Sequence, residues 1–129
     1  EDVVELYFKM CSINVNVRDL AHYGLVLACN GKDPATGRQL VDPWICRIVK
    51  TLMMTCGMYD ASGEFAVKVG LPAKSGVGGG ILASAEGRMV LATFALGLDK
   101  RGNSIGGWYA MEFLSQNLGL HYFSGYAAE

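Results

Sequence analysis

Residues 57–80 read GMYDASGEFAVKVGLPAKSGVGGG, and this stretch marks the point at which the sequence changes character. Upstream of it, apolar residues recur at helical spacing, whereas downstream of it glycines multiply and β-rich apolar runs replace that period. The stretch also gathers a tyrosine, a Lys-Ser-Gly triplet and a run of glycines. Three interpretations have to be weighed for it: a phosphate-binding loop, a nucleophilic Ser75 beside Lys74, or one wall of a site whose nucleophile lies elsewhere.

Two short helices are predicted at the start of the chain. In residues 2–10 apolar side chains recur at three- and four-residue intervals, which predicts a helix with Tyr7 on its buried side. A second helix is expected to begin after Asn16, because Asn16 and Asp19 have the spacing of a capping box, and to run to about Cys29.

A third helix and a closing helix are marked by their first residues. Asp42 and Pro43 predict a helix start, as cap and first helical position. One side of that helix is apolar and comprises Trp44, Ile45, Ile48, Val49, Leu52 and Met53. Near the end of the chain, Gly-Asn-Ser at residues 102–104 predicts the cap of a last helix. Its apolar positions are Ile105, Trp108, Met111, Leu114 and Leu118.

Between these helices, residues 75–85 and 88–98 predict two strands joined by a turn at Ala85-Glu86-Gly87. Both runs are too apolar for a sheet with one wet face, so we expect both faces to be covered, with helices on at least one. The predicted fold class is therefore α+β: several helices, then an antiparallel hairpin with Lys-Ser-Gly on its first strand, then a carboxy-terminal helix.

The composition limits the classes of function. The chain has 129 residues, 51% of them hydrophobic and 18% charged, which fits one well-packed domain or a large piece of one. Its net charge is −1, from 11 Lys plus Arg against 12 Asp plus Glu, so neither nucleic acid nor a membrane is expected as a partner. The four cysteines form no C-x-x-C pair and have no histidines at ligand spacing, which predicts reduced core residues and no metal site.

The phosphate-loop interpretation fails on its context. Gly78, Gly80 and Ala83 satisfy G-x-G-x-x-A, but a strand pattern follows them where a phosphate-binding helix should begin. A Walker loop requires glycine immediately before Lys-Ser, and Ala73 stands there. Glycines at 76, 78, 79 and 80 within a strand indicate instead that something approaches this backbone closely. That neighbour is either a packed strand or helix, or a ligand oxygen held by a main-chain N–H, and the sequence leaves both open.

Lys74-Ser75-Gly76 has the form K-[ST]-G, which lies on a strand beside the active site in serine β-lactamases and penicillin-binding proteins. In that architecture the attacking serine belongs to a separate S-x-x-K motif. No serine of this sequence has a lysine three residues later. The triplet therefore argues against Ser75 as the nucleophile.

Tyr59, just beyond the third helix, allows two interpretations. It is either a packing residue with a hydrogen-bonded hydroxyl or, near an activated serine, a proton carrier. His22 and His121 lie far apart in the sequence beside aromatic or apolar residues, so neither is expected to be catalytic.

Several longer segments are more specific than these short motifs. They read LYFKMCSINVNVRDLA, NGKDPATGRQL, TCGMYDASGEFAVKVGLPAKSGVGGGI and LDKRGNS. Together they closely resemble the carboxy-terminal half of the catalytic domain of serine-dependent glutaminases, which have a β-lactamase-like fold. By this resemblance residues 1–129 are part of one catalytic domain, with a helical part at 1–56 and the strands and closing helix at 57–129.

The resemblance implies hydrolysis of L-glutamine to L-glutamate and ammonia through an acyl-serine intermediate, without a metal or organic cofactor. It implies that Tyr59 is the catalytic residue of this chain, which binds substrate and carries the proton. Tyr7 would contact the substrate from the helical side, and the backbone N–H of Val77 would bind the carbonyl oxygen. The supporting strand would comprise Lys74, Ser75 and Gly76.

The family's Ser-x-x-Lys motif is missing from this sequence, so the chain alone is expected to be inactive. Two alternatives remain: a non-catalytic binding module derived from the same fold, and a β-lactamase-like or peptidase-like acyl transferase. Unpartnered edges and apolar faces predict association with a missing amino-terminal half or with a second copy. The expected compartment is the cytoplasm, or the mitochondrion if the source is eukaryotic.

Overall fold

The computed structural model describes residues 2–124. Along the chain the elements are α1 (Asp2–Cys11), α2 (Val17–Ala28), α3 (Pro43–Cys56), a short 3-10 helix η1 (Tyr59–Ala61), α4 (Ser62–Lys68), β1 (Ala73–Ser75), β2 (Gly80–Ala85), β3 (Met89–Phe94) and α5 (Ile105–Asn117). The predicted α+β class is confirmed. None of the helices among these residues is long and apolar enough to cross a membrane. The predicted domain also includes residue 1 and residues 125–129, which lie outside the described residues.

The strands of the described residues form one antiparallel sheet in the order β1-β2-β3. β2 pairs with β3 from Gly80 to Ala85, which confirms the predicted hairpin. β1 pairs with the other side of β2 and places Ser75 opposite Ile81. Within residues 2–124 no strand pairs with the outer edge of β3.

The glycine run forms a turn, not the continuous strand that the sequence suggested. The N–H of Gly76 donates to the carbonyl of Gly80 at 3.0 Å, and that of Gly79 donates to Gly76 at 2.9 Å. Gly79 has φ +97°, and a Cβ there would lie 2.6 Å from the carbonyl oxygen of Ala95. A close neighbour therefore explains this glycine. Around Gly78, by contrast, an added Cβ would meet nothing within 4 Å.

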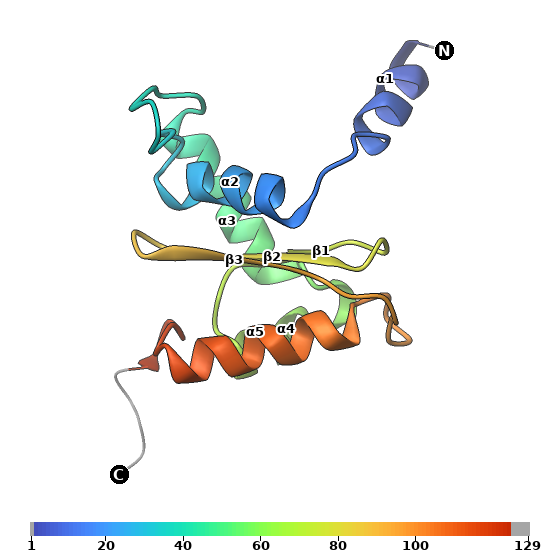
Figure 1. Cartoon of the computed structure of the whole chain (residues 1–129), viewed down its shortest axis with the longest axis vertical. Helices are drawn as coiled ribbons and strands as arrows, with labels where there is room; N and C mark the ends of the chain where they lie inside the picture. The colour runs from blue at the N-terminus through green and yellow to red at the C-terminus, as the bar shows by residue number, and fades with distance from the viewer. Residues whose placement is uncertain (1, 125–129) are drawn as a thin grey trace.

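Helices cover both faces of the sheet, as the apolar strands predicted. Figure 1 shows α2 and α3 over one face and α4 and α5 over the other. On the α4–α5 face, Phe65 packs edge-on against Trp108, with ring centroids 4.9 Å apart. The other buried members of this core are Met58, Val69, Leu71, Ala73, Ile81, Ala83, Ala85, Met111 and Leu120.

The buried core on the α2–α3 face is smaller and comprises Leu27, Cys46 and Met53. α2 lies very close to the sheet at Gly24, where a Cβ would come within 2.6 Å of the side chains of Leu82 and Val90.

The predicted helix starts are confirmed. The Asn16 side chain accepts a hydrogen bond from the N–H of Asp19, and the Asp19 carboxylate accepts one from the N–H of Asn16. Asp42 caps α3 ahead of Pro43, and Ser104 caps α5. Caps of this kind each contribute about 1 kcal/mol.

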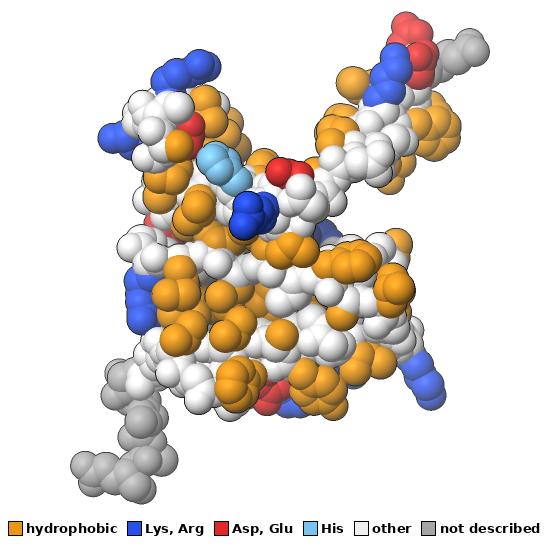
Figure 2. All heavy atoms as spheres, in the orientation of Figure 1, with side chains coloured by type: hydrophobic (Ala, Val, Ile, Leu, Met, Phe, Trp, Pro, Cys, Tyr) orange, Lys and Arg blue, Asp and Glu red, His pale blue; other side chains and the backbone are white. Residues whose placement is uncertain are grey.

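The predicted buried side of the first helix is wrong. α1 stands apart from the sheet beyond an extended linker, and none of Asp2–Cys11 is buried. Tyr7 is 63% exposed. Figure 2 shows the hydrophobic side chains that α1 leaves on the surface. Helical periodicity marks an apolar side, but a buried side also requires a partner, and within residues 2–124 α1 has none.

Only part of the apolar side of α3 is buried. Cys46 and Met53 are buried, whereas the exposed apolar residues of this helix are Trp44, Ile45, Ile48 and Leu52. The other cysteines, Cys11, Cys29 and Cys56, are exposed, so the prediction of core cysteines is correct for Cys46 alone. The sequence did not predict α4, because 7 residues give too few repeats of the helical period.

Candidate active site

The site is built where β1 passes over the end of α3. Gly57 caps α3, and a Cβ at this position would lie 1.8 Å from the carbonyl oxygen of Ala73. Because no side chain fits there, glycine allows β1 to cross directly over the helix end. The N–H of Ser75 donates to the carbonyl of Gly57 at 3.0 Å. The strand with Lys-Ser-Gly is thereby fixed to the residues that lead into Tyr59.

Tyr59 begins η1 in a left-handed conformation, with φ +53°, which is uncommon for a residue with a large side chain. Ser62 stabilises this turn, since its hydroxyl accepts from the N–H of Met58 at 3.0 Å and donates to the carbonyl of Tyr59 at 2.7 Å. The Tyr59 residue is 40% exposed, and its hydroxyl has no hydrogen-bond partner in the described part of the chain. The backbone of Tyr59 is therefore held firmly while its phenol remains accessible.

Asn103 connects Tyr59's turn to the Lys-Ser-Gly strand. It is 1% exposed, and its side-chain oxygen accepts from the Ser75 hydroxyl at 2.5 Å. Its side-chain nitrogen donates to the carbonyl of Met58 at 3.2 Å. Its backbone makes two further bonds with Asp99: the N–H donates to the carboxylate at 2.9 Å, and the carbonyl accepts from the Asp99 N–H at 2.8 Å.

The loop at residues 99–104 also brings Val77 and Tyr59 to one place. A Cβ at Gly102 would lie 3.5 Å from Cγ1 of Val77 and 3.6 Å from Cε2 of Tyr59. The backbone at Gly102, with φ +91°, therefore lies close to both side chains. Val77 is 70% exposed at the β1–β2 turn. Its N–H donates to no acceptor among residues 2–124.

Lys74 supplies a positive charge beside the phenol. Its ammonium lies 4.9 Å from the centroid of the Tyr59 ring and donates a hydrogen bond to the carbonyl of Ser75. A cation over an aromatic face contributes about 0.5–1 kcal/mol at an exposed position. Ser75 itself is only 3% exposed, and its hydroxyl points inward to Asn103.

Charged residues anchor the same loop to α4. Arg101 donates to the Glu64 carboxylate at 2.8 Å, and Lys68 donates to its other oxygen at 2.9 Å. Two hydrogen bonds hold the pKa of Glu64 below its usual value: the larger contribution comes from Arg101 and the next from Lys68.

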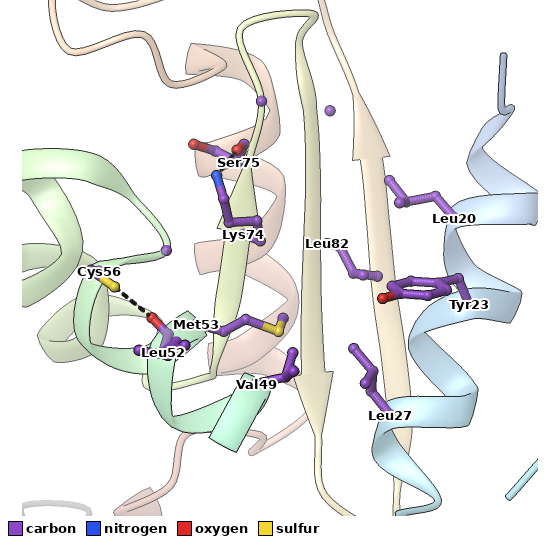
Figure 3. A pocket seen from close by; sticks show the side chains of 13 residues that line it. Leu20, Tyr23, Leu27, Val49, Leu52, Met53, Cys56, Lys74, Ser75 and Leu82 are labelled. Atoms are coloured by element: carbon purple, nitrogen blue, oxygen red, sulfur yellow. Dashed lines mark hydrogen bonds between the residues drawn. The ribbon is translucent and has the colours of Figure 1, made fainter. Parts of the chain in front are cut away.

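An apolar groove of about 530 Å³ adjoins the site on the α2–α3 face (Figure 3). Leu20 and Leu27 of α2 face Val49 and Met53 of α3 across it, and Lys74 borders it from β1. The groove therefore reaches the side chain that covers the Tyr59 ring.

The structure thus gathers Tyr59, Val77 and the predicted strand residues, but it does not bring Tyr7 to them. Tyr7 lies on the separate α1, where the neighbouring ring is that of Phe8, 6.3 Å away between centroids.

Sequence reasoning also missed three supporting residues: Ser62, Gly102 and Asn103. The sequence assigned the last two only to a helix cap. Their signal was the LDKRGNS segment, in which Gly102 and Asn103 directly precede the cap residue Ser104.

A sequence model of the Glutaminase family matches residues 1–123. The chain belongs to the glutaminase family. The glutaminase of Clostridioides difficile strain 630 is 57% identical over 123 residues, which are 95% of this chain and 40% of that protein. Glutaminase 2 of Clostridium perfringens is 52% identical over the same coverage. The chain therefore spans about two fifths of the length of these glutaminases.

Solved glutaminase structures share the fold. A Bacillus glutaminase structure determined in the presence of 4.3 M NaCl has a TM-score of 0.89 and 36% identity, and the match covers 93% of this chain and 42% of that one. A Bacillus subtilis glutaminase in covalent complex with 5-oxo-L-norleucine gives a TM-score of 0.87 and 36% identity, over 92% of this chain and 43% of that one. The predicted glutaminase resemblance and its β-lactamase-like fold are thereby confirmed.

Proposed function

We propose that this chain is the carboxy-terminal part of a catalytic domain that hydrolyses L-glutamine to L-glutamate and ammonia. Residues 1–56 and 57–129 are the helical and strand-bearing parts of that domain in this proposal. The observation that carries it is the closeness of both Tyr59 and Val77 to Gly102. The Tyr59 ring and the Val77 side chain then both lie beside one glycine, and the Val77 N–H donates to no acceptor among residues 2–124. Amide hydrolysis needs such a pair, a proton carrier and a donor for developing negative charge.

In the proposed reaction, a serine outside these residues attacks the side-chain amide carbon of glutamine. As the new C–O bond forms, the carbonyl oxygen becomes negative and accepts a hydrogen bond from the Val77 N–H. Tyr59 transfers the serine's proton to the amide nitrogen, the C–N bond breaks, and ammonia leaves. Water then attacks the acyl-serine, Tyr59 returns a proton to the serine oxygen, and L-glutamate is released.

The Lys-Ser-Gly strand supports this reaction without attacking the substrate. Ser75 is buried and its hydroxyl donates to Asn103, which makes it a poor candidate for a nucleophile. The Lys74 ammonium lies beside the Tyr59 ring and donates to the carbonyl of Ser75, so it holds the strand next to the phenol. Gly76 begins the turn that presents Val77.

The same proposal gives the exposed apolar surfaces a role. The groove between α2 and α3 and the separate α1 pack against the rest of the catalytic domain, and Tyr7 reaches the substrate through that packing. A second copy of the chain is the alternative partner. The cytoplasm remains the predicted compartment, and the mechanism uses no metal or organic cofactor.

A chimera tests the activity directly. Residues 1–123 of this chain would replace the matched 123 residues of the Clostridioides difficile glutaminase, and release of ammonia and glutamate from L-glutamine would be measured. We expect the chimera to turn over glutamine and the isolated chain not to do so. A folded chimera without activity contradicts the proposal and favours a non-catalytic binding module.

Covalent labelling locates the nucleophile. The Bacillus subtilis complex formed by reaction of that glutaminase with 6-diazo-5-oxo-L-norleucine. With the same reagent on the chimera, peptide mass spectrometry is expected to find the label outside residues 1–123. A label on Ser75, lost in Ser75→Ala, would contradict the assigned roles.

A further inference from the structure

We propose that Asn103 is a positioning residue that sets Tyr59 relative to Val77. This inference rests on the proposed function, because it assumes that Tyr59 carries the proton. Asn103 touches neither the Tyr59 ring nor the site of the substrate in this proposal. It acts through the carbonyl of Met58, the residue directly before Tyr59, and through Ser75, two residues before Val77.

The side chain of Asn103 uses both of its polar atoms across the site. The oxygen accepts from Ser75 on β1 at 2.5 Å, and the nitrogen donates to Met58 at the start of η1 at 3.2 Å. Asn103 is 1% exposed, so water cannot replace either partner at low cost. One planar amide therefore fixes the separation between the strand that leads to Val77 and the turn that carries Tyr59.

Tyr59 depends on such backbone contacts because its side chain makes no hydrogen bond within residues 2–124. Within the described residues its hydroxyl is unpaired, and its ring lies beside the Lys74 ammonium and Gly102. Its left-handed φ of +53° needs support from its surroundings. That support comes from Ser62, which binds the N–H of Met58 and the carbonyl of Tyr59, and from Asn103, which binds the carbonyl of Met58.

Asparagine is the side chain that this position requires. A leucine of similar size has neither donor nor acceptor, and an ionised aspartate can accept from Ser75 but cannot donate to Met58. A protonated aspartic acid, however, can do both, because it has one hydroxyl donor and one carbonyl acceptor. Asn103→Asp therefore restores the asparagine pattern at low pH and removes it at high pH.

Kinetics of the glutaminase chimera provide the first test. We expect Asn103→Leu to lower kcat by about 10- to 100-fold, with a smaller change in KM, because displacement of a catalytic group by about 1 Å can have such an effect. The matched control is Ser115→Ala on α5. It removes a buried hydroxyl that donates to the carbonyl of Val69 at 2.6 Å. Ser115→Ala is expected to lower thermal stability but to keep kcat within about 2-fold.

The pH profile of Asn103→Asp is the readout that a merely structural role would not change. Burial raises the pKa of a carboxyl group, so the substituted side chain is protonated at acidic pH. The ratio of variant to unsubstituted kcat, measured below the unfolding temperature, is expected to fall as pH rises. A ratio that stays near one at every pH, together with full kcat in Asn103→Leu, overturns the inference.

Amide hydrogen exchange in the chimera tests the inference without activity. The N–H of Met58 is protected by its bond to the Ser62 hydroxyl. If Asn103 holds this turn, Asn103→Leu should accelerate exchange at Met58 by about 10-fold or more, while Ser115→Ala leaves it unchanged. Unchanged exchange at Met58 in Asn103→Leu contradicts the inference. If Asn103→Leu does not fold stably, Asn103→Asp is measured at high pH in its place, and unchanged exchange at Met58 in that variant contradicts the inference.

The outcomes also separate this inference from the proposed function. If the chimera is inactive but Asn103→Leu accelerates amide exchange at Met58, the result contradicts the glutaminase proposal alone. An active chimera that loses activity with Tyr59→Phe but not with Asn103→Leu contradicts the positioning role alone.

Discussion

The two faces of the sheet differ in how fully this chain covers them. On the α4–α5 face, Phe65, Ile81 and Met111 are each at most 1% exposed. On the α2–α3 face, Tyr23 is 60% and Leu52 is 55% exposed, and they line an apolar groove of about 530 Å³. Residues 2–124 thus complete one core and leave the other open.

The candidate site lies on the boundary between these faces. Met58 belongs to the closed core, and the loop at residues 99–104 packs beside it. Lys74 belongs to the same site and lines the open groove. The backbone that holds Tyr59 and Val77 is therefore built by this chain, whereas the surroundings of the reaction depend on what covers the groove.

The largest expected effect tests the closed core against the open face. In the glutaminase chimera, Phe65→Ala should lower the free energy of unfolding by about 3–5 kcal/mol, because it empties a fully packed aromatic site. Leu52→Ala should cost about 2–3 kcal/mol if the rest of the domain fills the groove. Urea denaturation measures both.

Val67→Ala is the control for that comparison, since Val67 is 77% exposed on α4. Its cost should stay below about 0.5 kcal/mol. If Leu52→Ala costs as little as Val67→Ala, the groove stays open in the complete domain, and its proposed role in packing is wrong.

The next effect concerns the chemistry on the boundary. Tyr59→Phe in the chimera should lower kcat by about 100-fold or more, because it removes the hydroxyl that transfers the proton. Steady-state kinetics with L-glutamine measure this loss. Tyr109→Phe, at a 69% exposed position on α5, should leave kcat unchanged, and equal activity in both variants would remove Tyr59 from its catalytic role.

Features with a local cause could be predicted from the sequence. The capping box at Asn16 and the Asp42-Pro43 helix start depend on residues a few positions apart, and both are confirmed. The buried side of α1 could not be predicted, because periodicity reports an apolar side but not whether a partner covers it. The turn at residues 76–79 was taken for a strand, since glycine suits either conformation.

The candidate site also contains residues that could be predicted from the sequence and residues that could not. Tyr59 and Val77 were named through resemblance to a family, and the structure places both against Gly102. Asn103 was missed because its partners, Met58 and Ser75, lie 45 and 28 residues away in the sequence. The LDKRGNS segment draws attention to Asn103, but a single sequence does not show which distant polar groups it pairs with.

Two buried serines offer a smaller contrast between the faces. Ser115 on the closed face donates to Val69, so Ser115→Ala should cost about 1–3 kcal/mol by leaving a buried carbonyl unpaired. Ser84 on β2 is 1% exposed, and its hydroxyl has no partner among residues 2–124. Ser84→Ala should therefore be neutral or stabilising by up to about 1 kcal/mol. Thermal denaturation of the chimera decides, and a loss at Ser84 as large as at Ser115 would mean that the rest of the domain supplies a partner.

The smallest effect is electrostatic and lies at the edge of the closed face. Arg101 and Lys68 hold the pKa of Glu64 below its usual value, so the ion pairs stabilise the folded state above the unfolded-state pKa of about 4.3. That contribution is lost as pH falls through the lower folded-state pKa and the carboxylate is protonated. Arg101→Met should raise the pKa of Glu64 toward the usual value, as followed by NMR titration of its carboxyl carbon. The variant should be less stable than the unsubstituted protein at neutral pH, and the difference should vanish in acid.

Lys100→Met removes a neighbouring charge for which residues 2–124 provide no ion pair, and it should leave the Glu64 titration unchanged. If both variants shift the titration equally, general charge and not the bond from Arg101 sets the pKa of Glu64.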